Sequence, residues 1–589
     1  MENRKIQRHR ELVDTLMELY DGDMQMFYED VDNPNAYHTR LKKGRFHRYK
    51  YNATYAVALM DTEREKDIPI ANAILKSVID GQCKKEGDTF GLWPYFYEES
   101  LEDMDMPDWN MADFQGIELF QILLDHFEKV EDSLKEPLIQ AISDACECIM
   151  RRNVTISYTN VTAMDIYLCI AFGERYNDRI FEYGMKKLDL FHEIVIGCGY
   201  FQEYNSPTYT IVLTDSLSLM LEHIKNEAAL KKINELNDLA WNGIAKHYHP
   251  ATGQWTGTQN RAYTQFIKDG TRGYFEKALN YTVSLKGENK TGQIKKYQAN
   301  QISEGMLADI RYKPKCPEKY ADWFVNPEKQ ISYVQETDGN RRYAKCYMTP
   351  EYVIGTTNVS IGWNQHRNLL AYFGDKKDTY CLWQRAMHNG YDYSSTRMYI
   401  QQADNAALSM VIFYTDGADT HCSLDPTNGK IKAKDLRISY QIEAIREGII
   451  DKIEVIDKIK EENKVIFIIA GTKVEIGCTY AEFSGEKPYI EIKKDGKFLC
   501  FDIVFYNGDE KEFVLDEIQE AMSVSWLLVN SENCDIPVTE ENGDIVTAEW
   551  KINNNELKLQ STNKPAPVAD MGKTARQWAD GKEVDSKFY

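Results

Sequence analysis

The spacing of apolar residues changes once along this chain of 589 residues, close to residue 290. Before that point, apolar residues recur at the spacing of one helix face, as in residues 110–130. After it, stretches such as 464–480 and 488–506 are rich in β-branched residues, often alternate, and end at turn residues. The Lys-Lys-Asp-Gly stretch at 493–496 predicts a hairpin between two strands. This order predicts a helical half followed by a separate β half.

The helical half follows a rhythm of two helices and then a loop rich in Gly, Pro, Asp, Asn and aromatic residues. Such pairs, repeated over about 250 residues, predict an (α/α) toroid that forms an incomplete barrel. We therefore predict an α+β multidomain protein in which the toroid covers 1–288, an antiparallel β-sandwich covers 289–508, and a C-terminal β region covers 509–589. The polar stretch 285–296 is the predicted linker.

Composition narrows the class of partner. Hydrophobic residues make up 43% and charged residues 28%, as in ordinary soluble globular proteins. The formal net charge of −22 argues against general binding to nucleic acid or to an anionic membrane. An anionic substrate would need a local cluster of Arg, Lys or His.

The sequence also sets expectations about location and cofactors. It contains no apolar run long enough to span a membrane, and its charged first residues do not resemble a signal peptide, so we expect a cytoplasmic protein, with a removed leader left open. The 12 cysteines form no Cys-x-x-Cys pair and are expected to be free thiols. No nucleotide-binding or zinc motif is present. We expect that no cofactor is required, while a structural metal in the β half is left open. Nothing in the sequence predicts the oligomeric state.

Five loops of the helical half carry more polar and aromatic residues than turns require. Taken one at a time, each residue has a plain explanation as a helix cap or a core side chain. Successive loops of a toroid meet at one mouth, however, so together they predict a sugar-binding cleft. Its predicted substrate-binding residues are Trp93, Trp109, Asn110, Asp113, Tyr158, Tyr204, Trp255, Gln259 and Tyr263.

Short motifs in these loops resemble polysaccharide lyases of the heparinase II/III and alginate-lyase type, which join a helical toroid to an antiparallel β-sandwich. Residues 203–209, Glu-Tyr-Asn-Ser-Pro-Thr-Tyr, are similar to the start of the helix that carries the catalytic tyrosine in that family. The resemblance implies that Tyr209 is the catalytic acid, or both the acid and the base, and that Asn160 neutralises the substrate carboxylate. It also implies that Arg261 lies in the same mouth, together with Tyr263.

The chain departs from that family at two positions, because Val161 and Thr210 stand where the family usually has histidine. Any catalytic histidine must therefore come from elsewhere. His421, between two aspartates, is our predicted catalytic histidine, since a carboxylate can orient it. The other candidates are His192, His247, His249, His366 and His388.

The implied reaction is β-elimination on a uronic-acid-containing polysaccharide or oligosaccharide. The enzyme removes the proton at C5, next to the carboxylate, and expels the group on O4. Asn160 and a cation would stabilise the charge that develops on the carboxylate. A phenol has a pKa of about 10, so Tyr209 needs a cationic neighbour to act as a base, and Arg261 is the first choice. Glu203 is a supporting or alternative catalytic group.

Two alternatives stay open at this point. A glycoside hydrolase on the same toroid would need two carboxylates, for which Asp113 and Glu203 are candidates and Asp108 is a reserve. A non-catalytic carbohydrate-binding protein is the other. The expected partner of the lyase is an acidic oligosaccharide or polysaccharide.

Overall fold

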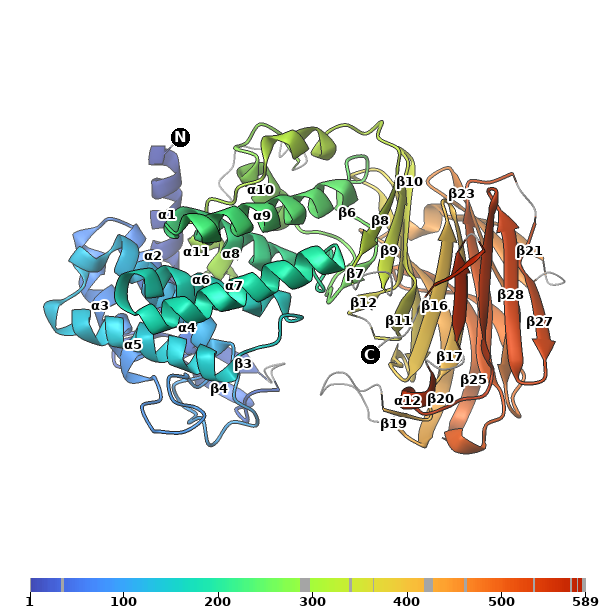
Figure 1. The fold of residues 1–589 in the computed structure, drawn as a ribbon, viewed down its shortest axis with the longest axis horizontal. Coiled ribbons are helices and arrows are strands. Elements are labelled where there is room, and N and C mark those ends of the chain that lie inside the picture. Colours follow the sequence, from blue (N-terminus) through green and yellow to red (C-terminus); the bar gives the residue numbers. More distant parts are fainter. Residues whose placement is uncertain are drawn as a thin grey trace. The chain divides into compact units, whose positions relative to one another are not determined.

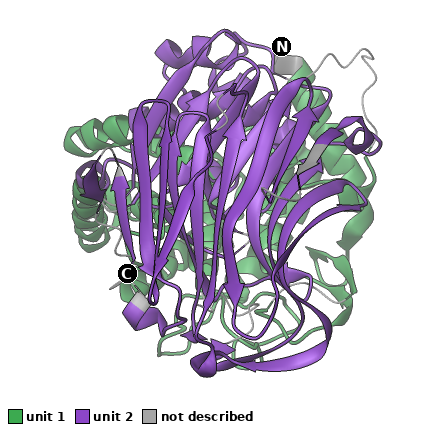
Figure 2. Ribbon diagram, turned by 90° about the vertical axis from the view of Figure 1, so that its right-hand side faces the viewer, with its two compact units in different colours: residues 1–194, 212–237, 288–315 green, residues 195–211, 238–287, 316–589 purple. Residues whose placement is uncertain are grey.

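The computed structural model describes residues 2–32, 37–285, 297–337, 342–363, 365–417, 427–459, 463–532, 535–571, 575–579 and 581–584. The chain forms two compact units (Figure 2). Unit 1 comprises Met1–Ile194, Val212–Asn237 and Glu288–Lys315, and unit 2 comprises Val195–Ile211, Asp238–Gly287 and Cys316–Tyr589. The predicted three-part division of the chain stays a prediction. Its linker lies outside the described residues, except for Leu285.

The first half of the chain is helical, as Figure 1 shows. The helices are α1 (Glu2–Leu16), α2 (Tyr49–Asp61), α3 (Ile68–Asp80), α4 (Met111–Asp125), α5 (Asp132–Arg152), α6 (Thr159–Tyr176), α7 (Asp178–Cys198), α8 (Tyr209–His223), α9 (Glu227–His247), α10 (Asp269–Ala278), α11 (Glu304–Ala308) and, near the C-terminus, α12 (Val568–Met571). Three of the sequence boundaries between the two units fall inside helices, namely α7, α8 and α9.

The helices of unit 1 form an inner and an outer layer. α2, α4 and α6 pack against one another in sequence and are buried over most of their length, because apolar and small residues occupy all sides of them. α3 and α5 pack against α2 and α4, and each buries one apolar stripe while its polar side remains exposed. This alternation is the arrangement of paired helices predicted from the loop rhythm.

Unit 2 contains two large antiparallel sheets among its described residues. The nine-stranded sheet consists of β8 (Ile331–Glu336), β9 (Tyr343–Met348), β10 (Tyr352–Thr357), β13 (Leu369–Gly374), β14 (Thr379–His388), β15 (Tyr391–Asp392), β20 (Lys430–Ala444), β24 (Tyr489–Asp495) and β25 (Phe498–Val514). The seven-stranded sheet consists of β11 (Val359–Ile361), β16 (Thr396–Ala403), β17 (Ala406–Phe413), β21 (Glu454–Ile459), β22 (Lys464–Ile469), β23 (Thr472–Phe483) and β26 (Ala521–Val529).

The two sheets share one apolar core. Phe373 and Ile438 of the nine-stranded sheet and Val411 and Ile476 of the seven-stranded sheet belong to the same buried cluster. The predicted hairpin is confirmed: β24 and β25 pair up to Asp495 and Phe498, and Gly496 takes a φ of +58° in the turn. A positive φ is easy for glycine, which explains its place there.

A third sheet of five described strands covers the other face of the seven-stranded sheet. It consists of β27 (Val538–Asn542), β28 (Ile545–Ile552), β29 (Asn555–Thr562), β30 (Arg576–Ala579) and β31 (Lys582–Val584). Trp550 of β28 packs against Trp526 of β26, with ring centroids 5.6 Å apart. The expected fold class, helical first and antiparallel β afterwards, is confirmed, although the boundary predicted at 508/509 falls within β25.

The remaining strands are short pairs: β1 (Tyr20–Asp21) with β2 (Met26–Phe27), β3 (Glu29–Asp32) with β4 (Lys43–Phe46), β5 (Tyr248–His249) with β6 (Gln254–Trp255), β7 (Gln259–Asn260) with β12 (His366–Arg367), and β18 (Asp416–Gly417) with β19 (Thr427–Asn428).

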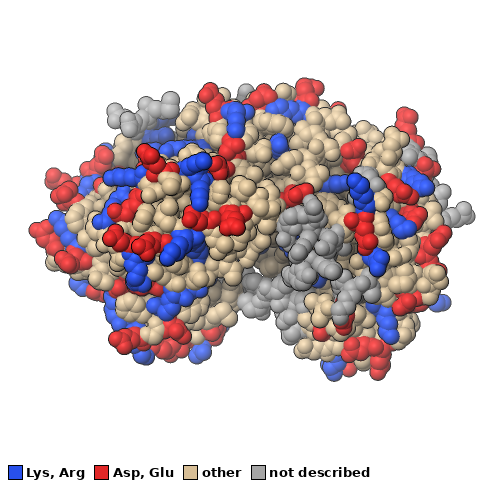
Figure 3. Space-filling view, in the orientation of Figure 1, with Lys and Arg blue, Asp and Glu red and all other residues tan. Residues whose placement is uncertain are grey.

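Acidic and basic side chains are interspersed on the face drawn in Figure 3. None of the helices in the described part of the chain is long and apolar enough to cross a membrane.

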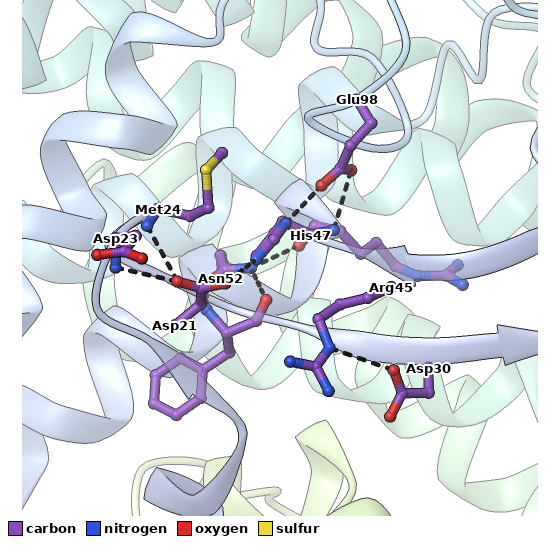
Figure 4. Close-up of polar contacts among 10 residues, drawn as sticks. Asp21, Asp23, Met24, Asp30, Arg45, His47, Asn52 and Glu98 are labelled. Atoms are coloured by element: carbon purple, nitrogen blue, oxygen red, sulfur yellow. Dashed lines mark hydrogen bonds and ion pairs between the residues drawn. The ribbon is translucent and has the colours of Figure 1, made fainter.

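Polar contacts fix the chain where it enters α2 (Figure 4). Asn52 accepts a hydrogen bond from the backbone N–H of Phe27 (2.7 Å) and donates one to the carbonyl of Phe27 (2.9 Å). The carboxylate of Glu98 accepts from the backbone N–H of His47 (3.0 Å) and lies 2.5 Å from its ring Nδ1. Asp21 lies 3.7 Å from the other ring nitrogen of His47.

The Glu98 contact predicts a pH dependence of stability. Burial tends to raise the pKa of Glu98, but the hydrogen bonds from His47 outweigh it and hold the pKa below its ordinary value of 4.5. A carboxyl with a lowered folded-state pKa stabilises the fold above its unfolded pKa and loses this effect as pH falls. We expect Glu98→Gln to lower the melting temperature at neutral pH and to lower it less as pH falls below about 4.5. The control is Glu86→Gln, at an exposed carboxylate. If Glu98→Gln lowered the melting temperature equally at neutral pH and below about pH 4.5, the prediction would be contradicted.

Candidate active site

The turn before α8 is built by residues that the sequence singled out. The backbone N–H of Tyr209 donates to Ser206 Oγ over 2.9 Å, so Ser206 caps the start of α8. Asn205, just before it, has a φ of +48°, which turns the chain sharply into the helix. Tyr209 is therefore the first residue of α8 and lies directly after a rigid turn.

A second segment of unit 2, 254–263, is tied to this turn. The Asn260 backbone N–H donates to the carbonyl of Tyr204 over 3.0 Å, and Asn205 Nδ2 donates to the carbonyl of Thr258 over 3.1 Å. Ser206 Oγ donates to the carbonyl of Arg261 over 3.1 Å. Two of the five predicted loops are therefore joined, through bonds that involve main-chain atoms.

This junction assembles a cluster of a carboxylate, a guanidinium and two phenols. Arg261 Nη1 donates to Glu203 Oε1 over 2.6 Å, and Arg261 Nη2 donates to the hydroxyl of Tyr209 over 3.0 Å. The hydroxyls of Tyr209 and Tyr263 lie 2.5 Å apart. Glu203 is buried, Tyr209 is partly exposed, and Tyr263 is 53% exposed. The cluster thus runs from a buried anchor to the surface.

The geometry of Arg261 determines what the cluster can do. Its guanidinium carbon lies 4.1 Å from the centre of the Tyr209 ring, and its backbone has a φ of +59°, which is uncommon for a residue with a side chain. Strain of this kind persists only where the surroundings impose it, and it is frequent at functional sites. A cation at hydrogen-bond distance favours the charged phenolate over the neutral phenol. The arrangement is therefore suited to proton transfer through Tyr209.

His366 belongs to the same neighbourhood, because β12 pairs with β7 and sets His366 opposite Asn260. Burial lowers the pKa of His366 to about 3, and the charges of Arg342, Arg261 and Arg367 add to this effect. The imidazole is therefore neutral at physiological pH. His366 is one of several candidate histidines in the sequence, but no local motif distinguishes it from the others, and only the pairing of β12 with β7 places it here.

In unit 1, another group of predicted residues lies at the starts of α4 and α6. Asn110 Nδ2 donates to the hydroxyl of Tyr158 over 3.4 Å, and its amide oxygen accepts from Arg152 over 2.9 Å. Trp109 is partly exposed, whereas Asn160 lies within the first turn of α6 and is 4% exposed. The predicted role of Asn160 toward a carboxylate stays a prediction.

Several residues predicted to bind substrate are buried. Trp93 and Trp255 are both 0% exposed. The Trp93 ring nitrogen donates to the carbonyl of Val78, and Trp255 packs in an apolar cluster of unit 2. Rings without exposed surface cannot stack on a sugar in this conformation, so both act as core residues. Tyr204 and Gln259 are buried as well, at 4% and 1% exposed.

The carboxyl group of Asp113 is buried in unit 1, where the side chain is 1% exposed. Burial raises the pKa of Asp113 well above its ordinary range, and the neighbouring Asp165 raises it further. Lys187 forms an ion pair with Asp165 at 2.6 Å. The contacts among Asp113, Asp165 and Lys187 account for the polar residues here without any bound substrate. His421, the predicted catalytic histidine, lies outside the described residues.

Among the described residues, no three or more His, Cys, Asp or Glu side chains are grouped so as to hold a metal ion. The fold and the cluster define a class of protein: a helical domain joined to antiparallel sheets, with a Tyr–Arg–Glu constellation in the unit that contains the sheets. The chain belongs to the family described as Domain of unknown function (DUF8769), whose model matches residues 11–310, just over half of the chain.

Comparison with curated proteins found no match. Among solved structures, the chain is similar to a Streptomyces coelicolor A3 chondroitin AC lyase in complex with chondroitin sulphate, with 8% identity, a TM-score of 0.47, and coverage of 95% of this chain and 85% of that one. It is also similar to a heparinase III, with 10% identity, a TM-score of 0.34, and coverage of 94% and 90%. A heparan sulfate lyase mutant from Pedobacter heparinus gives 8% identity, a TM-score of 0.32, and coverage of 92% and 82%.

Proposed function

We propose that this protein is a lyase that cleaves uronic-acid-containing oligosaccharides or polysaccharides by β-elimination. One observation carries the proposal: the hydroxyl of Tyr209, a partly exposed residue, lies 3.0 Å from Arg261 Nη2, while Arg261 is anchored by Glu203 at 2.6 Å. A tyrosine base needs a fixed cation beside it, and Arg261 supplies one. The site needs no metal or organic cofactor for this chemistry.

In the proposed reaction, the phenolate oxygen of Tyr209 takes the proton from C5 of the uronate. The electron pair of the broken C5–H bond forms the C4–C5 double bond, and the C4–O4 bond breaks. The leaving oxygen receives a proton from a phenol, either Tyr209 or Tyr263, whose hydroxyls lie 2.5 Å apart. Glu203 acts here as a positioning residue, since it holds Arg261 without facing solvent itself.

Local charge supports an acidic substrate in spite of the net charge of −22. Arg261, Arg342 and Arg367 each act on His366 as positive charges, so basic side chains outnumber the one carboxylate, Glu203, that pairs with Arg261 here. Arg367 is 4% exposed, and its guanidinium carbon lies 4.2 Å from the centre of the Trp383 ring. Such a cluster favours a carboxylate-bearing ligand over a neutral glycan.

The carboxylate-pair hydrolase is less well supported. Asp113 is almost fully buried, and the carboxylate of Glu203 is occupied by Arg261. A retaining or inverting hydrolase needs two carboxylates that reach the glycosidic bond.

Incubation of the purified protein with a panel of uronic-acid glycans tests the proposal. We expect ultraviolet absorbance from the unsaturated product to rise together with new chain ends on at least one glycan. New reducing ends without absorbance would identify a hydrolase instead, and binding without either product would identify a carbohydrate-binding protein. Neutral glycans of matched length serve as the control and should give no absorbance.

A further inference from the structure

The two phenol groups of the Tyr209 cluster lie close enough to exchange a proton directly. The hydroxyl oxygens of Tyr209 and Tyr263 are 2.5 Å apart, and their ring centroids are 5.9 Å apart at an angle of 51° between the rings. Oxygen atoms at this distance share one short O–H···O hydrogen bond. The cluster therefore holds two groups, side by side, that can each gain or lose a proton.

Backbone contacts hold this pair in place. Tyr209 is the first residue of α8, and its hydroxyl accepts from Arg261 Nη2 over 3.0 Å. Tyr263 lies two positions after Arg261 in the chain. Ala262, between them, donates its backbone N–H to the carbonyl of Gln365 over 2.9 Å. One short, anchored segment therefore positions both the cation and the second phenol beside Tyr209.

The arginine gives the two phenols different roles. A guanidinium at hydrogen-bond distance favours the phenolate form of Tyr209. A phenolate oxygen carries no proton, so Tyr263 is the donor in the short hydrogen bond between them. Tyr209 is then ready to accept a proton, and Tyr263, which is 53% exposed, has one to give.

The distance between the two oxygens limits the stereochemistry of elimination. A base on one face of a sugar ring and an acid on the opposite face must each reach the ring over about 3 Å, which sets the two roughly 6 Å apart. The phenol oxygens are 2.5 Å apart, too close to act from opposite faces. Together they can serve only a C5 hydrogen and a C4 oxygen that lie on the same face of the ring.

His366 is another proton acceptor in this neighbourhood, and it is poorly suited to take the C5 proton from the opposite face. Its pKa is lowered to about 3, chiefly by burial and further by the charges of Arg342, Arg261 and Arg367. A general base works best when its pKa lies near the working pH. So weak a base would contribute little to removal of the C5 proton at neutral pH.

We propose that Tyr209 and Tyr263 form a proton relay on one face of the sugar ring, and that the substrate is a uronate whose C5 hydrogen and C4 oxygen share that face. Glucuronate and mannuronate have this configuration, whereas iduronate, guluronate and galacturonate do not. This inference rests on the proposed lyase activity and adds the configuration of its substrate.

The relay returns to its starting state after each turnover. The C5–H bond breaks as its proton passes to the oxygen of Tyr209, and its electron pair forms the C4–C5 double bond. The C4–O4 bond breaks, and O4 takes the proton of Tyr263. Tyr209 is then a phenol and Tyr263 a phenolate, and one proton moving across the 2.5 Å between them restores both groups.

Glycans that differ in configuration at the uronate test the proposal with the full-length protein. Desulfated chondroitin and dermatan are C5 epimers, as are mannuronate and guluronate oligomers, and polygalacturonate differs at C4. We expect ultraviolet absorbance from the unsaturated product to rise at least about tenfold faster on the glucuronate or mannuronate member of a pair than on its C5 epimer. Equal or faster elimination on an iduronate, guluronate or galacturonate substrate would overturn this inference and leave the lyase proposal standing. Absence of absorbance on every glycan tested would overturn the lyase proposal, and this inference with it.

A variant tests the role of Tyr263 as the acid. Tyr263→Phe should slow elimination from an O4-linked substrate by about 10²-fold or more. Fluoride leaves without a proton, so this variant should eliminate it from a uronate fluorinated at C4 at close to the wild-type rate, whereas Tyr209→Phe should not. Tyr489→Phe, at an exposed tyrosine of the same unit, should match the wild type on both substrates. Near-normal cleavage of the O4-linked substrate by Tyr263→Phe, or an equal loss with both leaving groups, would overturn the relay.

Discussion

Replacing Tyr209 with phenylalanine is expected to lower the rate of double-bond formation by about 10²–10⁴-fold, while the fold is kept. The change removes one oxygen and leaves the ring that packs against Arg261. Without the hydroxyl, no group at this position takes the C5 proton, and the contact with Tyr263 is lost as well. The measurement is the initial rate of absorbance on the best substrate from the glycan panel.

The control for this variant is Tyr489→Phe, at an exposed tyrosine of β24 in the same unit. It removes the same atom from a surface position and should leave the rate unchanged. Near-normal elimination by Tyr209→Phe would rule out Tyr209 as the proton-transfer group. If both variants lost the elimination rate to the same extent, the loss would reflect a general effect on the folded protein rather than the removal of a catalytic hydroxyl.

Much of the fold could be predicted from local patterns. Helical spacing in residues 110–130 and alternation around 493–496 are properties of short segments, and the structure confirms α4 and the hairpin there. The Ser-Pro turn before Tyr209 was predictable for the same reason, because a cap is a contact between neighbours.

The composition of the candidate site was harder to predict, because it depends on contacts between distant segments. Arg261 meets Glu203 across 58 positions of the chain. Arg261 could be assigned to the site only because a short motif resembles one in known lyases, since the spacing of residues gave no such indication. His366 enters through the pairing of β12 with β7, more than 100 positions apart, and short strands of two residues leave no periodicity to detect.

Local sequence patterns also could not predict which of the aromatic side chains in the loops are buried. Trp109 and Trp255 occur in similar polar loops, yet one is partly exposed and the other is fully buried. A tryptophan suits a sugar face and a protein core equally well, so the residue type does not separate the two roles. Only the packing around each ring decides between them.

The largest effect on stability is expected at Lys187, because it compensates buried acid groups. Lys187 and Asp165 are 4% and 3% exposed at their side chains, and the Lys187 ammonium also donates to the carbonyl of Val154 over 3.0 Å. Lys187→Met would leave the carboxyl groups of Asp165 and Asp113 buried without this cation. We expect a loss of about 3–5 kcal/mol in the free energy of unfolding, measured by urea denaturation.

Two comparisons make this result specific. Lys186→Met changes the neighbouring lysine, which is exposed, and should cost little. Adding Asp165→Asn to Lys187→Met removes the uncompensated charge and should recover most of the stability. A full deficit in the double variant would mean that Lys187 acts through its contacts with Val154 and Tyr183 instead.

The pH dependence of the same variant separates charge from packing. Burial raises the pKa of Asp165, and the ion pair with Lys187 opposes this rise, so loss of the lysine moves the folded-state pKa further upward. A carboxyl whose folded-state pKa exceeds its unfolded value destabilises the fold more as pH rises, since the unfolded chain releases its proton first. The deficit of Lys187→Met should therefore be larger at about pH 8 than at about pH 5. A cavity or a lost hydrogen bond would produce the same deficit at both pH values.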